Sequence, residues 1–110
     1  MVQAITPHAA QQLLASGEVE VIDVREPHEW ATGTIPGARR IALGELRRNP
    51  KAALTRDDVI FVCAAGVRSE TAARVAVASG LKRVYNLTCG MRGWERAGLP
   101  VAYPELAAAV

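Results

Sequence analysis

Short apolar runs alternate along the chain with longer segments in which apolar residues recur at helical spacing. The clearest run is 59–62, four consecutive apolar residues that predict a strand buried on both faces. Further strands are expected at residues 4–5 (a short edge strand), 19–24, 39–42 and 83–87. Strands that alternate with helices are typical of a mostly parallel sheet covered by helices on both faces. The pattern therefore predicts one α/β domain.

Helices are expected between these strands, and their ends carry recognisable signals. Thr6 can cap a helix that starts with Pro7, and Gly17 can end it, with Leu13 and Leu14 facing inward. Further helical segments are expected at residues 27–30, 43–54 (interrupted at Pro50), 70–78 (ended by Gly80), 91–97 and, in part, 104–110.

One cysteine lies where the predicted central strand gives way to a helix. Cys63 opens the loop Cys-Ala-Ala-Gly-Val-Arg-Ser, at the strand end where open α/β sheets place ligands. The loop amides, the start of the helix and Arg68 should all favour thiolate over thiol. The alternative is a cysteine buried only for packing. The small residues of the loop, Gly66 and Arg68 favour a reactive nucleophile.

These residues also resemble the active-site loop of the rhodanese family of sulfurtransferases, in the pattern Cys63-x-x-Gly66-x-Arg68-Ser69. Matching segments flank the loop in family order: Asp-Val-Arg-Glu-Pro-His-Glu-Trp at 23–30, Gly-x-Ile-Pro-Gly-Ala at 33–38, and Gly90-x-x-x-Trp94. The resemblance runs from about residue 19 to residue 100. It implies the rhodanese fold, a five-stranded α/β sandwich, and sulfur transfer through a Cys63 persulfide.

The resemblance implies a set of site residues around the nucleophile. Arg68 would add positive charge and hold the loop. The substrate would be bound by the backbone of Ala64, Ala65, Gly66, Val67 and Ser69. Asp23, at the end of a buried strand, needs a partner because an unpaired buried carboxylate is costly. Arg25, Arg68 or a loop amide could supply that partner, and we expect Asp23 and Arg25 to support the site rather than react.

Two positions depart from the family pattern. The family usually has His where Thr34 stands, so any hydrogen bond from that ring is missing or altered. It commonly has Gly where Cys89 stands. Cys89 is either a second thiol able to resolve a persulfide or, as we favour, a small side chain tolerated in a tight turn.

The expected reaction moves sulfane sulfur from a small donor such as thiosulfate to cyanide, a thiol or a protein. A sulfur-relay module with a protein acceptor is an alternative, because Ala64 and Ala65 bring no charge to the rim of the loop. A phosphatase or arsenate reductase is a weaker alternative. Related phosphatases have five residues between Cys and Arg, whereas four intervene here.

Composition excludes several other classes of protein. A net charge of +2 over 110 residues is too weak to argue for nucleic acid. The two Cys and two His show no metal-ligand spacing, and no Gly-rich nucleotide loop occurs, so no metal or cofactor is expected. No signal peptide and no apolar stretch of about 20 residues is found. We therefore expect a cytoplasmic protein that does not bind a membrane.

Overall fold

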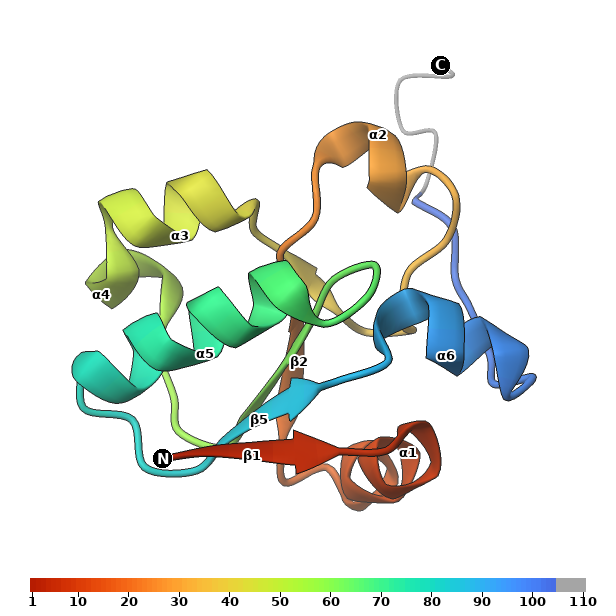
Figure 1. The fold of residues 1–110 in the computed structure, drawn as a ribbon, viewed down its shortest axis with the longest axis horizontal. Coiled ribbons are helices and arrows are strands. Elements are labelled where there is room, and N and C mark those ends of the chain that lie inside the picture. Colours follow the sequence, from red (N-terminus) through yellow and green to blue (C-terminus); the bar gives the residue numbers. More distant parts are fainter. Residues whose placement is uncertain (105–110) are drawn as a thin grey trace.

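A five-stranded parallel sheet forms the centre of the molecule (Figure 1), as the sequence predicts. The computed structural model describes residues 1–104, so the helical segment expected at 104–110 lies almost entirely outside the described residues. The strand order is β1-β5-β4-β2-β3. The strands are β1 (Val2–Ile5), β2 (Glu20–Asp23), β3 (Arg39–Arg40), β4 (Val59–Val62) and β5 (Val84–Leu87).

The most apolar run of the sequence becomes the middle strand. All four residues of β4 are buried, because β5 and β2 flank it and helices cover both faces of the sheet. The predicted edge strand is also confirmed, and β1 is longer than expected, since it begins at Val2. Because all the strands are parallel, β2, β4 and β5 end at one edge of the sheet. That edge carries Cys63.

Two separate layers of core cover the two faces of the sheet. On one face, Phe61 and Ile22 pack with Leu46 and Ala73 from the helices α3 and α5. On the other face, residues such as Ile60 pack with side chains of α1 and α6, among them Trp94. The alternation of side chains along a strand produces this division. Figure 1 shows α5 and α1 on opposite sides of the sheet.

The helices follow the predicted segments, with one shifted start. They are α1 (Pro7–Ser16), α2 (Pro27–Trp30), α3 (Leu43–Arg48), α4 (Pro50–Ala53), α5 (Val67–Ala78) and α6 (Gly90–Arg96). Thr6 caps α1 as predicted, its hydroxyl oxygen accepting from the amide of Ala9 at 3.2 Å. The predicted start of α5 at residue 70 is wrong: the helix begins at Val67, so Arg68 and Ser69 lie in its first turn. Within residues 1–104, no helix combines the length and apolarity that a membrane span requires.

A buried ion pair lies at the carboxyl end of β2. The guanidinium of Arg25 donates to both carboxylate oxygens of Asp23, with the shortest contact at 2.7 Å, and also to the carbonyl of Gly33 at 2.8 Å. Asp23 is fully buried and Arg25 is 4% exposed. Of the partners considered for Asp23, the structure shows both Arg25 and a loop amide, since the backbone N–H of Arg25 also donates to Asp23 at 3.0 Å. The pair ties β2 to the segment that follows α2.

We predict that Asp23→Asn lowers the free energy of unfolding by about 3 kcal/mol or more, because it leaves Arg25 buried without a counter-charge. Urea denaturation with constant m-value would measure the loss. Glu20→Gln is the matched control. It breaks the pair of Glu20 with Arg39, which is 38% exposed, and should cost less than about 1 kcal/mol. Equal costs for both variants would contradict a special role for the buried pair.

Candidate active site

The loop between β4 and α5 can form only because two glycines allow a second loop to pack against it. Gly66 has φ +95°, and a Cβ placed there would collide with the carbonyl of Thr88. Gly90 has φ +60°, and a Cβ placed there would collide with the carbonyl of Ala64. The loop after β4 and the loop after β5 are therefore in direct backbone contact.

The start of α6 fixes the orientation of the peptide groups that follow Cys63. The amide of Met91 donates to the carbonyl of Cys63 at 2.8 Å, and the amide of Arg92 donates to the carbonyl of Ala64 at 3.2 Å. The C=O and N–H of a trans peptide point in opposite directions. Because the carbonyl of Ala64 is turned toward α6, the N–H of Ala65 is turned away from α6, toward the interior of the loop.

Several donors converge on the sulfur of Cys63. The amides of Gly66 and Ser69 donate to Sγ at 3.1 and 3.3 Å, and the hydroxyl of Ser69, which can either donate or accept there, lies 3.2 Å away. Burial, the largest single influence, raises the pKa of the Cys63 thiol, but hydrogen bonds from Ser69, Ala65 and Gly66 together outweigh it and lower the pKa below the ordinary value. Cys63 is only 1% exposed. The loop therefore favours the anionic form of a buried sulfur.

Arg68 is engaged by a carboxylate of another helix. Its guanidinium makes two parallel hydrogen bonds to Glu29 of α2, at 2.7 and 2.9 Å. The hydrogen bonds from Arg68 are the main cause that lowers the pKa of Glu29 from 4.5 to about 2. The positive charge expected beside the sulfur is therefore largely balanced by Glu29. The hydrogen bonds of Arg68 join α5 to α2, whereas the sequence suggested bonds within the loop.

The remaining predicted residues divide into an inner and an outer group. Ser69 is fully buried against the sulfur, whereas Val67 is 75% exposed and Ala65 is also exposed. The Asp23–Arg25 pair binds Gly33 and makes no hydrogen bond to the Cys63 loop, which fits the supporting position expected for it. Among residues 1–104, no cluster of three potential metal ligands occurs.

Asn86 is a site residue that the sequence analysis missed. It lies in β5, is 3% exposed, and accepts the hydroxyl proton of Ser69 at 2.6 Å. Its side-chain nitrogen donates to the carbonyl of Gly66 at 3.2 Å and to Glu70 at 3.1 Å. The available signal was a single amide in an otherwise apolar strand expected to lie beside the strand of Cys63.

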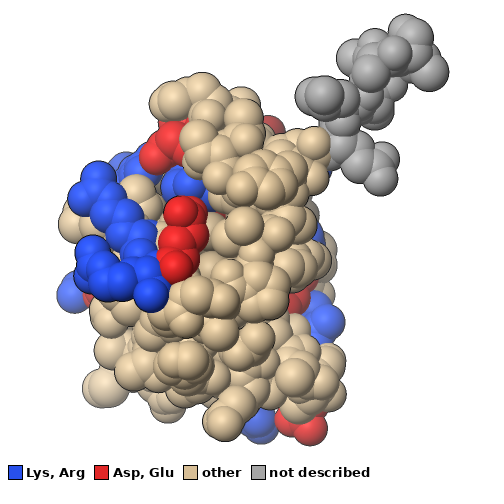
Figure 2. Space-filling view, turned by 90° about the vertical axis from the view of Figure 1, so that its right-hand side faces the viewer, with Lys and Arg blue, Asp and Glu red and all other residues tan. Residues whose placement is uncertain are grey.

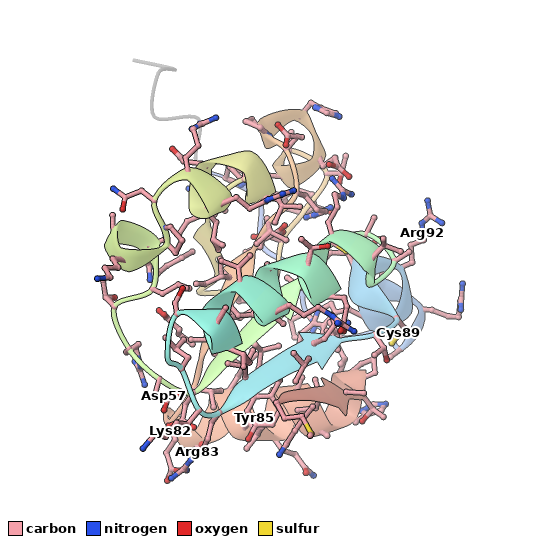
Figure 3. The ribbon with its side chains drawn as sticks, turned by 60° about the vertical axis from the view of Figure 1, so that its left-hand side comes forward. Asp57, Lys82, Arg83, Tyr85, Cys89 and Arg92 are labelled. Atoms are coloured by element: carbon pink, nitrogen blue, oxygen red, sulfur yellow. The ribbon has the colours of Figure 1, made fainter. Side chains whose placement is uncertain are left out.

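The two positions that depart from the family pattern face other parts of the fold. Thr34 is buried and pairs through its backbone with Ala102, its amide donating at 2.7 Å. The side chain of Cys89 occupies the space above Gly93, where an added Cβ would lie 2.5 Å from its sulfur. Figure 3 shows Cys89 and Arg92 near the start of α6, with their side chains extending to different sides of it. This placement of Cys89 fits a small side chain accommodated in a turn.

Charge is unevenly distributed on the face that carries α6. In Figure 2, Lys and Arg side chains gather at one edge of this face with acidic side chains beside them, and most of the remainder is uncharged. Arg92 is exposed and makes no ion pair within the described part of the chain. The backbone amide of Arg92 donates to the carbonyl of Ala64, so Arg92 belongs to the segment that packs against the Cys63 loop.

Comparison with known proteins agrees with this arrangement. The family model for the rhodanese-like domain matches residues 6–97. A sulfurtransferase of Allochromatium vinosum is 35% identical over 96% of this chain and 99% of its own length. A candidate sulfur carrier of Bacillus subtilis, YrkF, is 37% identical over 82% of the chain, which spans about half (49%) of that relative. The crystal structure of a rhodanese-related protein from Thermoplasma volcanium is 31% identical, with a TM-score of 0.82 over 91% of this chain and 97% of the other.

We predict opposite effects of the two members of the Arg68–Glu29 pair on the ionisation of Cys63. Arg68→Ala should raise the apparent pKa of the thiol and Glu29→Gln should lower it, because the second change leaves the guanidinium unbalanced. Each shift should stay below about one unit, since solvent screens a pair that is about a third exposed. The rate of alkylation measured against pH reports the midpoint.

Glu29 stays ionised over the pH range in which Cys63 is titrated, so its ion pair with Arg68 is intact throughout. A carboxyl whose pKa is lowered in the folded state contributes stability above its unfolded value of 4.5, and loses it as pH falls through about 2. Midpoints that do not move in either variant would show that the sulfur does not sense the charge of Arg68.

Proposed function

The chain belongs to the rhodanese-like family, and we propose that it is a sulfurtransferase that carries sulfane sulfur as a persulfide on Cys63. The supporting observation is the buried sulfur of Cys63, which is surrounded by hydrogen-bond donors and has a lowered pKa. A thiolate is the nucleophilic form of cysteine. Both cysteines are free thiols, as suits work in a reducing compartment such as the cytoplasm.

The reaction consists of two sulfur transfers. With thiosulfate as donor, the Cys63 thiolate attacks the outer sulfur, a new S–S bond forms, and the old S–S bond breaks with its electron pair leaving on sulfite. A nucleophilic acceptor, such as cyanide or a thiol, then attacks the outer sulfur of the persulfide, and the Cys63 thiolate leaves. Because the enzyme alternates between two covalent states, ping-pong kinetics are expected.

The loop would serve the intermediate as well as the free thiolate. In the persulfide, negative charge lies on the outer sulfur rather than on Sγ. Amides from Ala65, Gly66 and Ser69 supply fixed dipoles around Sγ, one bond from this position, and need no reorganisation during the transfer. The backbone of Ala64 and Val67 completes the turn that holds these amides. Among the expected substrate-binding residues, those whose amides lower the pKa of Cys63 are therefore proposed to act directly.

A protein acceptor is the second candidate, and the exposed rim of the loop favours it. Val67 is 75% exposed, and it stands beside Ala65, so the rim offers apolar surface instead of charge. A small dianion gains little from such a surface, whereas a protein that carries a thiol can pack against it. In this form of the proposal the chain relays sulfur between proteins.

We predict that Cys63→Ser abolishes sulfur transfer while the fold is retained, because a hydroxyl is far less ionised than a thiol at neutral pH. Sulfite release from thiosulfate measures turnover, and mass spectrometry after incubation with thiosulfate detects the added sulfur atom. Cys89→Ala is the matched control and should keep most of the turnover. Full activity of Cys63→Ser would refute the persulfide mechanism, and complete loss in Cys89→Ala would make the second thiol essential.

We further predict that thiosulfate is used with a high KM because Ala64 and Ala65 place no cation at the rim. Ala64→Arg and Ala65→Lys should lower KM about two- to fivefold, as expected for an exposed charge pair. The value of kcat should change little, because the added charge binds ground and transition states alike. Added salt should weaken the gain.

Steady-state kinetics at two ionic strengths would measure these effects. Ala52→Lys, an exposed alanine of α4, is the control for net charge and should leave KM unchanged. A wild-type KM in the low micromolar range, or equal gains from all three variants, would show that charge at the rim does not limit thiosulfate use.

A further inference from the structure

The orientation of the Asn86 side chain is fixed by its partners. Its nitrogen donates to the Gly66 carbonyl and to Glu70, both of which can only accept. A flipped amide would place its oxygen against these two acceptors. The oxygen of Asn86 must therefore face Ser69, and it can only accept a proton there.

Two acceptors then compete for one proton. The hydroxyl of Ser69 lies 2.6 Å from Oδ1 of Asn86 and 3.2 Å from Sγ of Cys63. Since a hydroxyl has a single hydrogen, it cannot donate to both. While it donates to Asn86, its lone pair faces the sulfur, which suits an S–H donor and not a thiolate. When Cys63 releases its proton to solvent, the hydroxyl has to leave Asn86 to stabilise the anion.

We propose that Asn86 is a positioning residue that competes with Cys63 for the Ser69 proton and thereby sets how readily the nucleophile ionises. The inference rests on the proposed function for its biological meaning, but it concerns the free enzyme. Asn86 holds the resting site closer to the thiol form than the loop amides alone would. Once a persulfide forms, Sγ carries no charge, and the hydroxyl of Ser69 returns to Asn86. The competition therefore disfavours the free thiolate relative to the persulfide.

Charged groups near the loop do not take part in this exchange. The titratable and charged side chains on the surrounding elements come from α5, α2, β2, β5 and α6 and the residues next to them: Arg68, Glu70, Arg74, Glu26, His28, Glu29, Glu20, Asp23, Arg25, Tyr85, Cys89, Arg92, Glu95 and Arg96. Two ion pairs form among them, Asp23 with Arg25 and Arg68 with Glu29. Glu70 binds Arg74 with one oxygen and Asn86 with the other. Among the described residues, the hydroxyl of Ser69 makes hydrogen bonds with Asn86 and Cys63 and with none of these charged groups.

The test is the midpoint of Cys63 ionisation in Asn86→Leu. This variant removes the competing acceptor with little change of volume, so the hydroxyl is free to donate to the sulfur. We expect the midpoint to fall by about one pH unit, a tenfold change in the ionisation constant. Alkylation rate against pH and thiolate absorbance would report it in Cys89→Ala protein, where Cys63 is the single thiol. An unchanged or raised midpoint would overturn the proposal.

A double-mutant cycle separates the hydroxyl from the loop backbone. If Asn86 acts through Ser69, then Asn86→Leu should shift the midpoint by less than about 0.3 unit in a Ser69→Ala background. The same fall in both backgrounds would overturn the proposal, because Asn86 would then act through the Gly66 carbonyl. Ser69→Ala alone should raise the midpoint by less than about one unit, because the Ser69 hydroxyl stabilises the thiolate only at the expense of its bond to Asn86; a rise of more than a full unit would contradict the competition.

Two further variants separate the role of Asn86 from the charge of Glu70 and from a failure to fold. Glu70→Gln keeps an acceptor for the Asn86 nitrogen and removes the negative charge of Glu70. The midpoint of Cys63 ionisation should then be unchanged, and a fall of one unit in this variant would overturn the assignment to Asn86. Asn86→Ala removes the same acceptor and serves if Asn86→Leu does not fold, as judged by circular dichroism. Because every readout is the ionisation of the free enzyme, the result is independent of whether sulfur transfer is observed.

Discussion

The candidate site depends on the fixed direction of a few peptide groups around a buried sulfur. The amides of Met91 and Arg92 hold the carbonyls of Cys63 and Ala64, and this orients the N–H groups on the other side of the turn. Gly66 and Gly90 permit the close backbone contact that this arrangement requires. The start of α6 therefore helps to stabilise the thiolate of Cys63 through its backbone amides and not through a side chain.

The sulfur of Cys63 is hydrogen-bonded to neutral dipoles, and two of the cations near the loop are held in ion pairs, whereas Arg92 makes none among the described residues. Arg68 is balanced by Glu29, and Arg25 is balanced by Asp23. The lowered pKa of Cys63 arises from hydrogen bonds to backbone amides and to Ser69, working against burial. Such dipoles are oriented by the fold and respond less to salt than an exposed ion pair does. A neutral site also places little electrostatic restriction on the donors and acceptors that approach it.

The sequence predicts the fold better than it predicts the polar contacts of the site. Apolar runs and helix-end residues such as Thr6 and Gly17 are local signals, and they located every strand and helix within a few residues. The start of α5 was misplaced because Val67 and Arg68 fit equally well in a loop or in a first helical turn. The pairing of Arg68 with Glu29 joins residues 39 apart in the chain, and the contact of Asn86 with Ser69 depends on the order of the strands. Neither leaves a local pattern.

Burial of the sulfur affects whether the empty or the sulfur-loaded form of the protein is favoured in the proposed reaction. A free thiolate on Cys63 carries a desolvation cost, since the residue is 1% exposed, and hydrogen bonds from the loop are needed to offset that cost. In the proposed persulfide the charge would reside one bond farther from the buried Sγ. Desolvation and the competition at Ser69 therefore act in the same sense, and both favour the sulfur-loaded protein over the empty one. In the proposed relay between proteins, such a site would hold its sulfur until an acceptor reaches the rim.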